Sequence, residues 1–132
     1  MPQGSVLGPL LYLIYVNDIV NLSPNLLPIL FADDTNVFMS GDNIAETIGL
    51  MNEAIDKSLD WTIVNKLSLN IDRTHYIIFT SRGRKVRTNL SVLLNTTPLN
   101  KVEDTKFRGV VIDSKLTWSD HIKHIKRSYL KE

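Results

Sequence analysis

The sequence predicts an α+β fold, in which helices pack against a mostly antiparallel sheet. Two segments, near residues 44–59 and 118–129, repeat apolar residues at helical spacing. Short runs rich in Ile, Val, Phe and Leu, bounded by Gly, Pro, Asn and Ser, indicate strands. These helices and strands do not alternate strictly, which is typical of an α+β arrangement. With 132 residues, the chain is long enough for one hydrophobic core.

Three helices are expected. The first covers residues 9–20, begins at Pro9, whose missing N–H costs nothing there, and is apolar nearly all round, so it should be buried. The second follows Asn43, which has capping-box spacing to Glu46. Its apolar repeat covers residues 44–59, and the helix is expected to continue up to residue 65. The third carries separate apolar and basic faces. The apolar positions of the last two helices are Ile44, Ile48, Met51, Ile55 and Leu59, then Trp118, Ile122, Ile125 and Tyr129.

Strands are expected at residues 28–32, 35–39, 76–80, 90–94, 97–102 and 107–112. The first two flank Asp33 and Asp34 and should pair with each other. The fourth and fifth should form a hairpin across Asn95 and Thr96. Residues 1–9 and the basic stretch at 82–85 are predicted to be loops.

The composition restricts the class of protein. The apolar fraction of 43% and the aromatic fraction of 8% are those of a soluble globular protein. The absence of cysteine excludes disulfides and thiolate zinc sites, and it fits an intracellular location, in the nucleus or the cytoplasm. The most apolar run, residues 10–16, is too short to cross a bilayer, and no positive region precedes it as in a signal peptide, so no membrane partner is expected.

The net charge of +1 conceals an asymmetry along the chain. Residues 1–81 hold three Lys/Arg and nine Asp/Glu, whereas residues 82–132 hold twelve Lys/Arg and five Asp/Glu. Such a division would suit a protein that holds metal ions with one part and a polyanion with the other. An ordinary solvated surface is the alternative, and charge counts taken alone favour it.

Asp33 and Asp34 are the residues expected to carry chemistry. They lie side by side between two apolar runs, although adjacent carboxylates repel and burying either one unpaired is costly. At a tight strand-to-strand turn both side chains can reach one spot, and a divalent cation would let both stay ionised. Two such ions about 4 Å apart serve nucleotidyl transfer. The alternative is a plain turn with the side chains bonded to local amides, which the bare dipeptide favours.

Five ordered segments carry a family resemblance. Residues 31–34, Phe-Ala-Asp-Asp, resemble the F/Y-x-D-D box of reverse transcriptases, and residues 2–11, PQGSVLGPLL, resemble the P-Q-G-S-x-L-G-P-L-L motif that precedes it. Residues 65–70, NKLSLN, with Arg73 and Thr74, are similar to the N-K-L-x-L-N-x-x-K-T segment of the non-LTR, LINE-type branch. Residues 107–110, FRGV, resemble its F-L-G-V box. Residues matching the region that follows are Leu116, Thr117, Trp118, His121 and Ile122.

The resemblance implies a right-hand polymerase palm over residues 1–112 that runs into the start of the thumb at residues 113–132. Asp33 and Asp34 would be catalytic and would ligate two Mg²⁺ ions, with Asp33 the more important. The partners would be an RNA template, a DNA primer and deoxynucleoside triphosphates. The residues implied at the nucleotide and template are Gln3, Gly4, Phe31, Ala32, Asn70 and Arg73. Those implied in the primer grip, the turn that holds the primer, are Phe107, Gly109 and Val110. For the grip residues, an ordinary buried strand is an equal alternative.

The chain also departs from the family pattern. Arg73 stands where the family has Lys, and Arg stays protonated, so it could only neutralise phosphate charge. Arg108 stands where an apolar residue is expected. The family's third metal-binding aspartate belongs to an upstream box, and that box and the fingers are not among these 132 residues. The two-ion site is therefore expected to be incomplete.

Basic residues of the second half are expected at nucleic-acid phosphates, with solvated surface as the competing interpretation. They are Arg82, Arg84, Lys85 and Arg87 in a loop, and Lys123, Lys126 and Arg127 on the last helix. His121 and His124 are expected to be surface residues rather than metal ligands, because there is no cysteine and no H-E-x-x-H motif.

The sequence thus predicts a fragment of an RNA-directed DNA polymerase of a non-LTR retrotransposon, with little or no activity by itself. Two alternatives stay open. One is a non-catalytic nucleic-acid-binding remnant that uses the basic second half. The other is the product of a degenerate reading frame.

Overall fold

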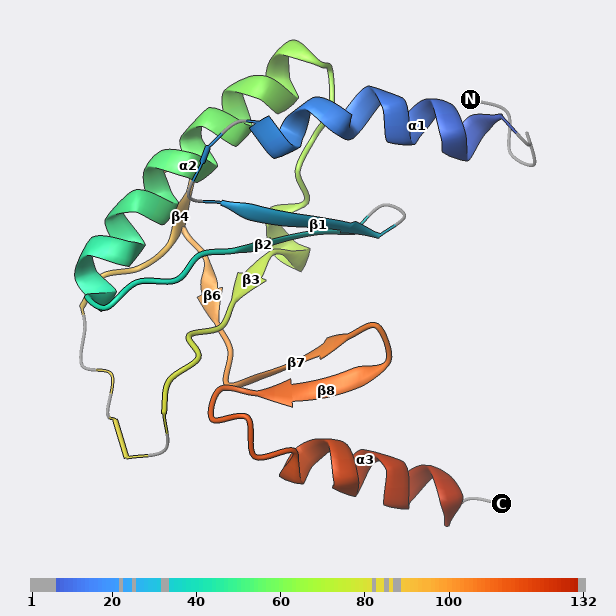
Figure 1. Cartoon of the computed structure of the whole chain (residues 1–132), viewed down its shortest axis with the longest axis vertical. Helices are drawn as coiled ribbons and strands as arrows, with labels where there is room; N and C mark the ends of the chain where they lie inside the picture. The colour runs from blue at the N-terminus through green and yellow to red at the C-terminus, as the bar shows by residue number, and fades with distance from the viewer. Residues whose placement is uncertain are drawn as a thin grey trace.

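The computed structural model describes residues 7–21, 23–24, 26–31, 34–81, 83–84, 86 and 89–130. Helices and strands are both present, so the predicted α+β class is confirmed (Figure 1). The helices are α1 (Gly8–Val16), α2 (Ile44–Val64) and α3 (Ser119–Tyr129), with two short 3₁₀ helices, η1 (Asn17–Asn21) and η2 (Ile71–Arg73). The strands are β1 (Leu27–Phe31), β2 (Asp34–Phe38), β3 (His75–Tyr76), β4 (Leu93–Leu94), β5 (Thr97–Pro98), β6 (Asn100–Lys101), β7 (Asp104–Phe107) and β8 (Val110–Asp113).

The strands of the described residues form four separate two-stranded ladders rather than the single sheet that was expected. β1–β2, β4–β5 and β7–β8 are antiparallel hairpins, and β3–β6 is parallel. Strands β3 to β6 are each two residues long. Such short strands offer too few backbone hydrogen bonds to join the hairpins into one sheet.

The core forms between one face of α2 and the segments around β3 to β6. Its buried residues are Ile48, Val92, Leu94 and Leu99. The residues packed around them are Ile44, Met51, Ile55, Leu59, Tyr76 and Ile78, so every predicted apolar position of α2 contributes to the core. The start of α2 is confirmed as well, because the Asn43 side chain accepts a 3.0 Å hydrogen bond from the Ala45 N–H.

Asn52 on α2 fixes the neighbouring hairpin to the helix. Its Nδ2 donates to the Ser91 carbonyl at 3.2 Å, and its Oδ1 accepts from the Leu93 N–H at 2.9 Å. On the side of β4 that faces α2, no described strand pairs with it, and the Asn52 side chain supplies hydrogen bonds to the backbone instead.

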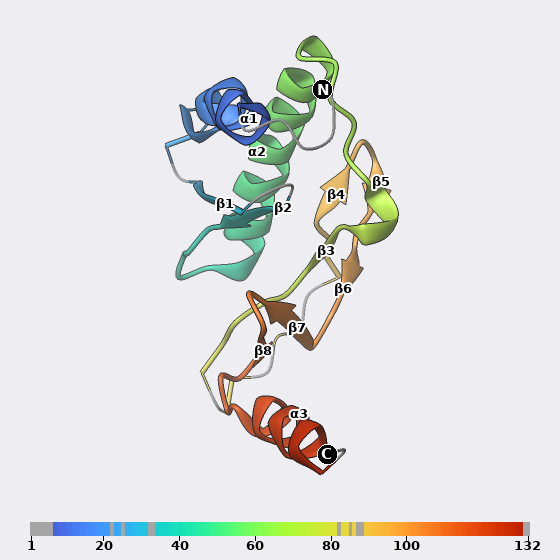
Figure 2. The same cartoon turned by 90° about the vertical axis from the view of Figure 1, so that its right-hand side faces the viewer.

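The prediction for the first helix is wrong in its end and in its burial. α1 ends at Val16 and continues as η1, and among the side chains described in this segment Val16 and Ile19 are the buried ones. The reason is that this helix is apolar on every side, while only one side faces the rest of the chain (Figure 2). The residues left about half exposed are Leu10, Leu11, Leu13, Ile14 and Tyr15. No helix in the described part of the chain combines the length and apolarity needed to cross a membrane.

Three strand predictions need correction. The strand expected at residues 76–80 is limited to β3, because beyond Tyr76 the segment makes only isolated backbone bonds such as Thr80 N–H to the Ser114 carbonyl, 3.1 Å. The hairpin across Asn95 and Thr96 is confirmed but short, since residues 100–101 leave it to pair with β3. The single strand expected at 107–112 is instead the β7–β8 hairpin, which turns at residues 108–109.

α3 lies at the opposite end of the molecule from α1 and α2 (Figures 1 and 2). It is joined to β8 by the Val111 N–H, which donates to Nδ1 of His121 at 3.3 Å. His121 is therefore half-buried and structural, which corrects its prediction as a surface residue, whereas His124 is exposed as predicted. The predicted apolar positions Ile122, Ile125 and Tyr129 are exposed along α3.

Candidate functional site: the aspartate hairpin and the β7–β8 turn

The β1–β2 hairpin presents the candidate catalytic aspartates. Its ladder runs in register from the Leu27–Phe38 pair to the Phe31–Asp34 pair, so the two strands are connected through residues 32 and 33 alone. Ala32 and Asp33 lie outside the described residues. Asp34 is exposed, and its carboxylate has no hydrogen bond or ion pair with any described residue. None of the residues that the structure describes therefore occupies this carboxylate.

The register also assigns side chains to the two faces of the ladder. Cross-strand partners share a face, and so do alternate residues of one strand. Phe31, Asp34 and Phe38 therefore lie on the same face of the β1–β2 hairpin. An aromatic side chain stands at each end of that face, and the candidate metal ligand lies directly opposite one of them.

The turn of the β7–β8 hairpin meets this face. The guanidinium carbon of Arg108 lies 4.6 Å from the centroid of the Phe31 ring and 5.6 Å from that of Phe107. Phe107 in turn makes an edge-to-face contact with Phe38, with 6.2 Å between ring centroids. Two motifs that are more than 70 residues apart in sequence, FADD and FRGV, are thus brought together.

The β7–β8 turn itself explains the glycine in the FRGV motif. Phe107 and Val110 pair across a two-residue loop, in which Arg108 has φ 47° and Gly109 has φ 86°. Hairpin turns of this length favour positive φ at both central residues, which glycine adopts without strain. The turn that the family resemblance implied at Phe107, Gly109 and Val110 is therefore present, whereas the continuous strand predicted from the apolar run is wrong.

Two further candidates are engaged in local structure. Asn70 caps η2, with its side-chain oxygen 3.3 Å from the Arg73 N–H, and its carbonyl accepts from the Thr74 hydroxyl at 2.7 Å. The Arg73 side chain is exposed. Neither residue has a contact with the aspartate hairpin among the interactions of the described residues, so their predicted place at the nucleotide phosphates stays a prediction.

The predicted basic contacts divide into two groups. On α3, Lys126 and Arg127 are exposed in the last turn, while Lys123 pairs with Asp120 at 2.9 Å. In the loop, Arg84 donates from Nη2 to the Asp42 carbonyl at 3.2 Å. The other predicted site residues that lie outside the described residues are Gln3, Gly4, Arg82, Lys85 and Arg87.

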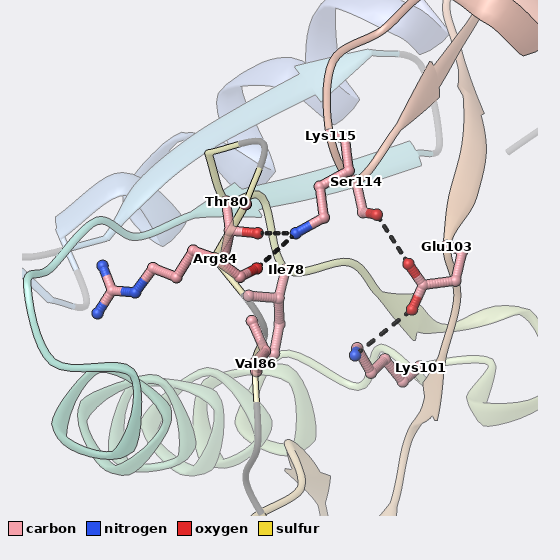
Figure 3. Close-up of a pocket in the computed structure, with 9 residues that line it drawn as sticks. Ile78, Thr80, Arg84, Val86, Lys101, Glu103, Ser114 and Lys115 are labelled. Carbon is pink, nitrogen blue, oxygen red and sulfur yellow. Dashed lines mark hydrogen bonds and ion pairs between the residues drawn. The ribbon is translucent and has the colours of Figure 1, made fainter.

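A separate pocket of about 500 Å³ lies next to the segments 101–103 and 114–115 (Figure 3). Its other lining residues are Ile78, Thr80, Gly83, Arg84 and Val86. Its polar groups satisfy one another. Lys115 Nζ donates to the Thr80 hydroxyl and to the Arg84 carbonyl, and the Ser114 hydroxyl donates to Glu103 at 2.7 Å. The Arg84 guanidinium points away from it (Figure 3). These bonds join three chain segments, and we assign the pocket a structural role.

Charge in this pocket is balanced locally. The Ser114 hydroxyl, followed by the Lys101 ammonium 3.5 Å away, lowers the pKa of Glu103 below its ordinary value. A second carboxylate, Asp113, has its pKa lowered chiefly by the hydrogen bond from the backbone N–H of Thr117. Both acids are held in their ionised form by donors, as expected for structural carboxylates.

The fit of the site to Mg²⁺ depends on oxygen donors that converge. No group of three or more His, Asp or Glu side chains that could hold a metal is present among the residues that the structure describes. Asp34 places one exposed carboxylate at the end of the ladder, and Asp33 adjoins it in sequence. Carboxylate oxygens are the ligands that Mg²⁺ prefers. The donor type therefore fits Mg²⁺, and Asp34 could supply part of its coordination sphere.

Comparison with known proteins identifies the class. A family model described as reverse transcriptase (RNA-dependent DNA polymerase) matches residues 1–112 of the chain. The match covers both the FADD segment and the FRGV turn that the fold brings together. The chain belongs to the reverse transcriptase family.

The relatives are polymerases of mobile elements, as the non-LTR resemblance predicted. The chain is 29% identical to the RNA-directed DNA polymerase from mobile element jockey of Drosophila funebris and 28% identical to that of Drosophila melanogaster, over 98% of its own length in each case. It is 29% identical, over 96% of its length, to the probable RNA-directed DNA polymerase from transposon X-element of Drosophila melanogaster. The chain spans about 14% of the length of these relatives. No solved structure matches it significantly.

Proposed function

We propose that this chain is the part of an RNA-directed DNA polymerase that carries two of its metal-binding aspartates. The reaction would add deoxynucleotides to a DNA 3′ end on an RNA template. The observation that carries the proposal is the β1–β2 hairpin, within the segment matched to the reverse transcriptase family. Its ladder ends at Asp34, which is exposed and has no partner among the described residues. In this interpretation residues 1–112 belong to the palm and residues 113–132 begin the thumb.

Asp33 and Asp34 would hold Mg²⁺ in this proposal, and the ions would supply the positive charge that nucleotidyl transfer requires. The chain's own contribution is the β1–β2 ladder, which places Asp34 at its end, next in sequence to Asp33. Phe31 opposite Asp34 would exclude water from one side of the site and so strengthen its electrostatic interactions. The remaining donors would come from another segment of the polymerase.

The nucleic acid would bind with its primer strand at the β7–β8 turn, through Phe107, Gly109 and Val110. Gln3, Gly4, Phe31, Ala32, Asn70 and Arg73 would serve the template base and the incoming nucleotide. Exposed cations would contact phosphates, and Lys126 and Arg127 support this because they have no carboxylate partner among the described residues. Catalysis would take place inside the cell, in the nucleus or the cytoplasm, which the absence of cysteine supports.

The test is a chimeric polymerase in which this chain replaces the aligned segment of the Drosophila funebris jockey polymerase. We expect the chimera to incorporate deoxynucleotides on a primed RNA template with Mg²⁺. Asp33→Asn and Asp34→Asn should each reduce the rate by more than about 100-fold, because each removes several kcal/mol of transition-state stabilisation. Asp42→Asn, which removes an exposed carboxylate in the loop before α2, is the matched control and should leave the rate unchanged.

A non-catalytic nucleic-acid-binding remnant is the second candidate, favoured by the exposed cations of α3. It predicts that the chain binds primed template and that neither aspartate variant weakens binding. A chimera that folds and binds primed template, yet incorporates nothing, would contradict the polymerase proposal and support this one.

A further inference from the structure

The proposed contact of the β7–β8 turn with the primer does not explain where the Arg108 side chain lies. Its guanidinium lies 4.6 Å from the Phe31 ring centroid and 5.6 Å from that of Phe107. Among the described residues it has no hydrogen bond and no ion pair, so the two aromatic rings are its contacts. Arginine commonly lies over aromatic faces in this way, because its flat, weakly hydrated cation is attracted to the electron-rich ring.

The contact reaches the candidate metal site through one residue. Phe31 is the cross-strand partner of Asp34, and such partners hold their Cβ atoms about 4.5–5.5 Å apart. Phe31 is also 55% exposed, so about half of this side chain is open to solvent. A contact that holds the Phe31 ring in place therefore also holds the side chain that lies next to Asp34.

The backbone of the β7–β8 turn directs Arg108 toward the Phe31 ring. Arg108 adopts φ 47°, a conformation that L side chains adopt at a cost, and Phe107 beside it packs edge-to-face on Phe38. The turn is thereby held at one end of the β1–β2 face while Arg108 extends to Phe31 at the other end. A leucine at this position, as in the family pattern, could pack on Phe31 but would lack the reach and the cation.

We infer that Arg108 is a positioning residue, which holds Phe31 and through it sets the arrangement of the aspartate hairpin beside the primer-side turn. This inference rests on the proposed function for its consequence in catalysis. The physical link between Arg108, Phe31 and Asp34 is a property of the metal-free chain and can be tested there.

The test uses nuclear magnetic resonance on the purified 132-residue chain without metal. Ring currents should displace the Arg108 side-chain protons upfield, and Phe31→Leu should remove most of that displacement. Arg108→Leu should move the amide signals of Phe31 and Asp34. Amide exchange at the end of the β1–β2 ladder should be about two- to fivefold faster, the factor that corresponds to the cation–π magnitude at an exposed site. Arg108→Lys, which keeps the charge but not the flat face, should restore part of the shift.

Lys106→Leu is the matched control. Lys106 is an exposed cation two residues earlier on β7, with Val111 as its ladder partner, so its loss should leave the hairpin signals in place. The leucine and lysine variants of Arg108 both retain a Cβ at positive φ, so the turn strain stays similar. The double variant Phe31→Leu/Arg108→Leu should exchange no faster than the single variants, because both remove the same contact.

A second readout separates positioning from simple charge. In the presence of Mn²⁺, Phe31→Leu and Arg108→Leu should both change the pattern of paramagnetic broadening at Asp34 in the same direction. If the Arg108 charge alone mattered, only the Arg108 variant would change it. Unmoved Phe31 and Asp34 signals in Arg108→Leu, or additive effects in the double variant, would overturn the inference. If Mn²⁺ did not broaden the Asp34 signal in the parent chain or in any variant, while the metal-free contact between Arg108 and Phe31 was intact, the result would count against the proposed metal site instead.

Discussion

The carboxylate of Asp113 accepts a hydrogen bond of 2.9 Å from the backbone N–H of Thr117 and one of 3.0 Å from its hydroxyl. The same carboxylate accepts from the N–H groups of Lys115 and Trp118, at 3.0 and 2.9 Å. Leu116 and Trp118 have positive φ values, 51° and 64°, in this loop. One acidic side chain thus stabilises a strained connection between β8 and α3.

Substitution of Asp113 should release α3 from the rest of the chain. The donors now bind both oxygens of the Asp113 carboxylate, whereas the amide of Asp113→Asn would offer them a single acceptor oxygen. We therefore expect the thermal midpoint to fall and amide protection in residues 119–123 to drop several-fold. Asp104→Asn is the control, because Asp104 is the cross-strand partner of Asp113 and its side chain is exposed. Equal losses in the two variants, measured by hydrogen exchange, would contradict the role of Asp113.

The lowered pKa values predict a loss of stability in acid. The pKa of Glu103 lies below its ordinary 4.5, and that of Asp113 lies below its ordinary 3.8. The folded chain therefore binds protons more weakly than the unfolded chain at these groups, so stability falls as the pH falls. The contribution should be complete above about pH 5, and it should be lost as the pH falls below the ordinary pKa values and through the lowered pKa values of the folded chain. Solvent screening keeps the share of the exposed Glu103 small.

Urea unfolding of the parent chain and of Asp113→Asn between about pH 3 and pH 6 measures this effect. The variant should show a shallower dependence of the unfolding free energy on pH. Glu103→Gln should flatten the dependence less. Parallel curves for all three proteins would show that these carboxylates do not link folding to protonation.

The core around α2 predicts where truncation is most costly. Leu94 is 2% exposed, so Leu94→Ala should lower the free energy of unfolding by about 2–5 kcal/mol. Ile48→Val, a milder change in the same cluster, should cost about 0.5–1.5 kcal/mol. Val64→Ala at the 80% exposed end of α2 should stay within about 0.5 kcal/mol. A Val64 effect equal to that of Leu94 would mean that the core does not lie where the structure has it.

The cations of α3 predict a salt dependence. If Lys126 and Arg127 contact phosphates, their joint replacement by alanine should reduce the slope of log affinity against log salt by about two for a primed RNA template. Lys57→Ala, at an exposed position of α2, is the control and should leave the slope unchanged. Fluorescence anisotropy at several salt concentrations measures the slope. An unchanged slope in the double variant would remove α3 from the proposed nucleic-acid surface.

Local signals in the sequence predicted part of the fold well. The steps of three and four from Ile44 to Leu59 predicted α2, and the two apolar runs around the aspartates predicted the β1–β2 hairpin. The prediction failed where it needed non-local information. Residues 77–80 have strand-like composition, but no strand among the described residues pairs with them. The apolar run 107–112 was expected to continue as a strand, although Gly109 at φ 86° lets it turn.

The sequence by itself determined the family, the adjacent carboxylates, the apolar face of α2 and the β1–β2 hairpin, because motifs and periodicities depend on side chains within a few positions of one another. Only the tertiary structure decided that Arg108 contacts Phe31, that His121 is bound to β8 and that α1 stays half exposed. Contacts of this kind depend on which faces of separate elements meet. That choice is set by packing and by side-chain reach across distances that no short window of sequence contains.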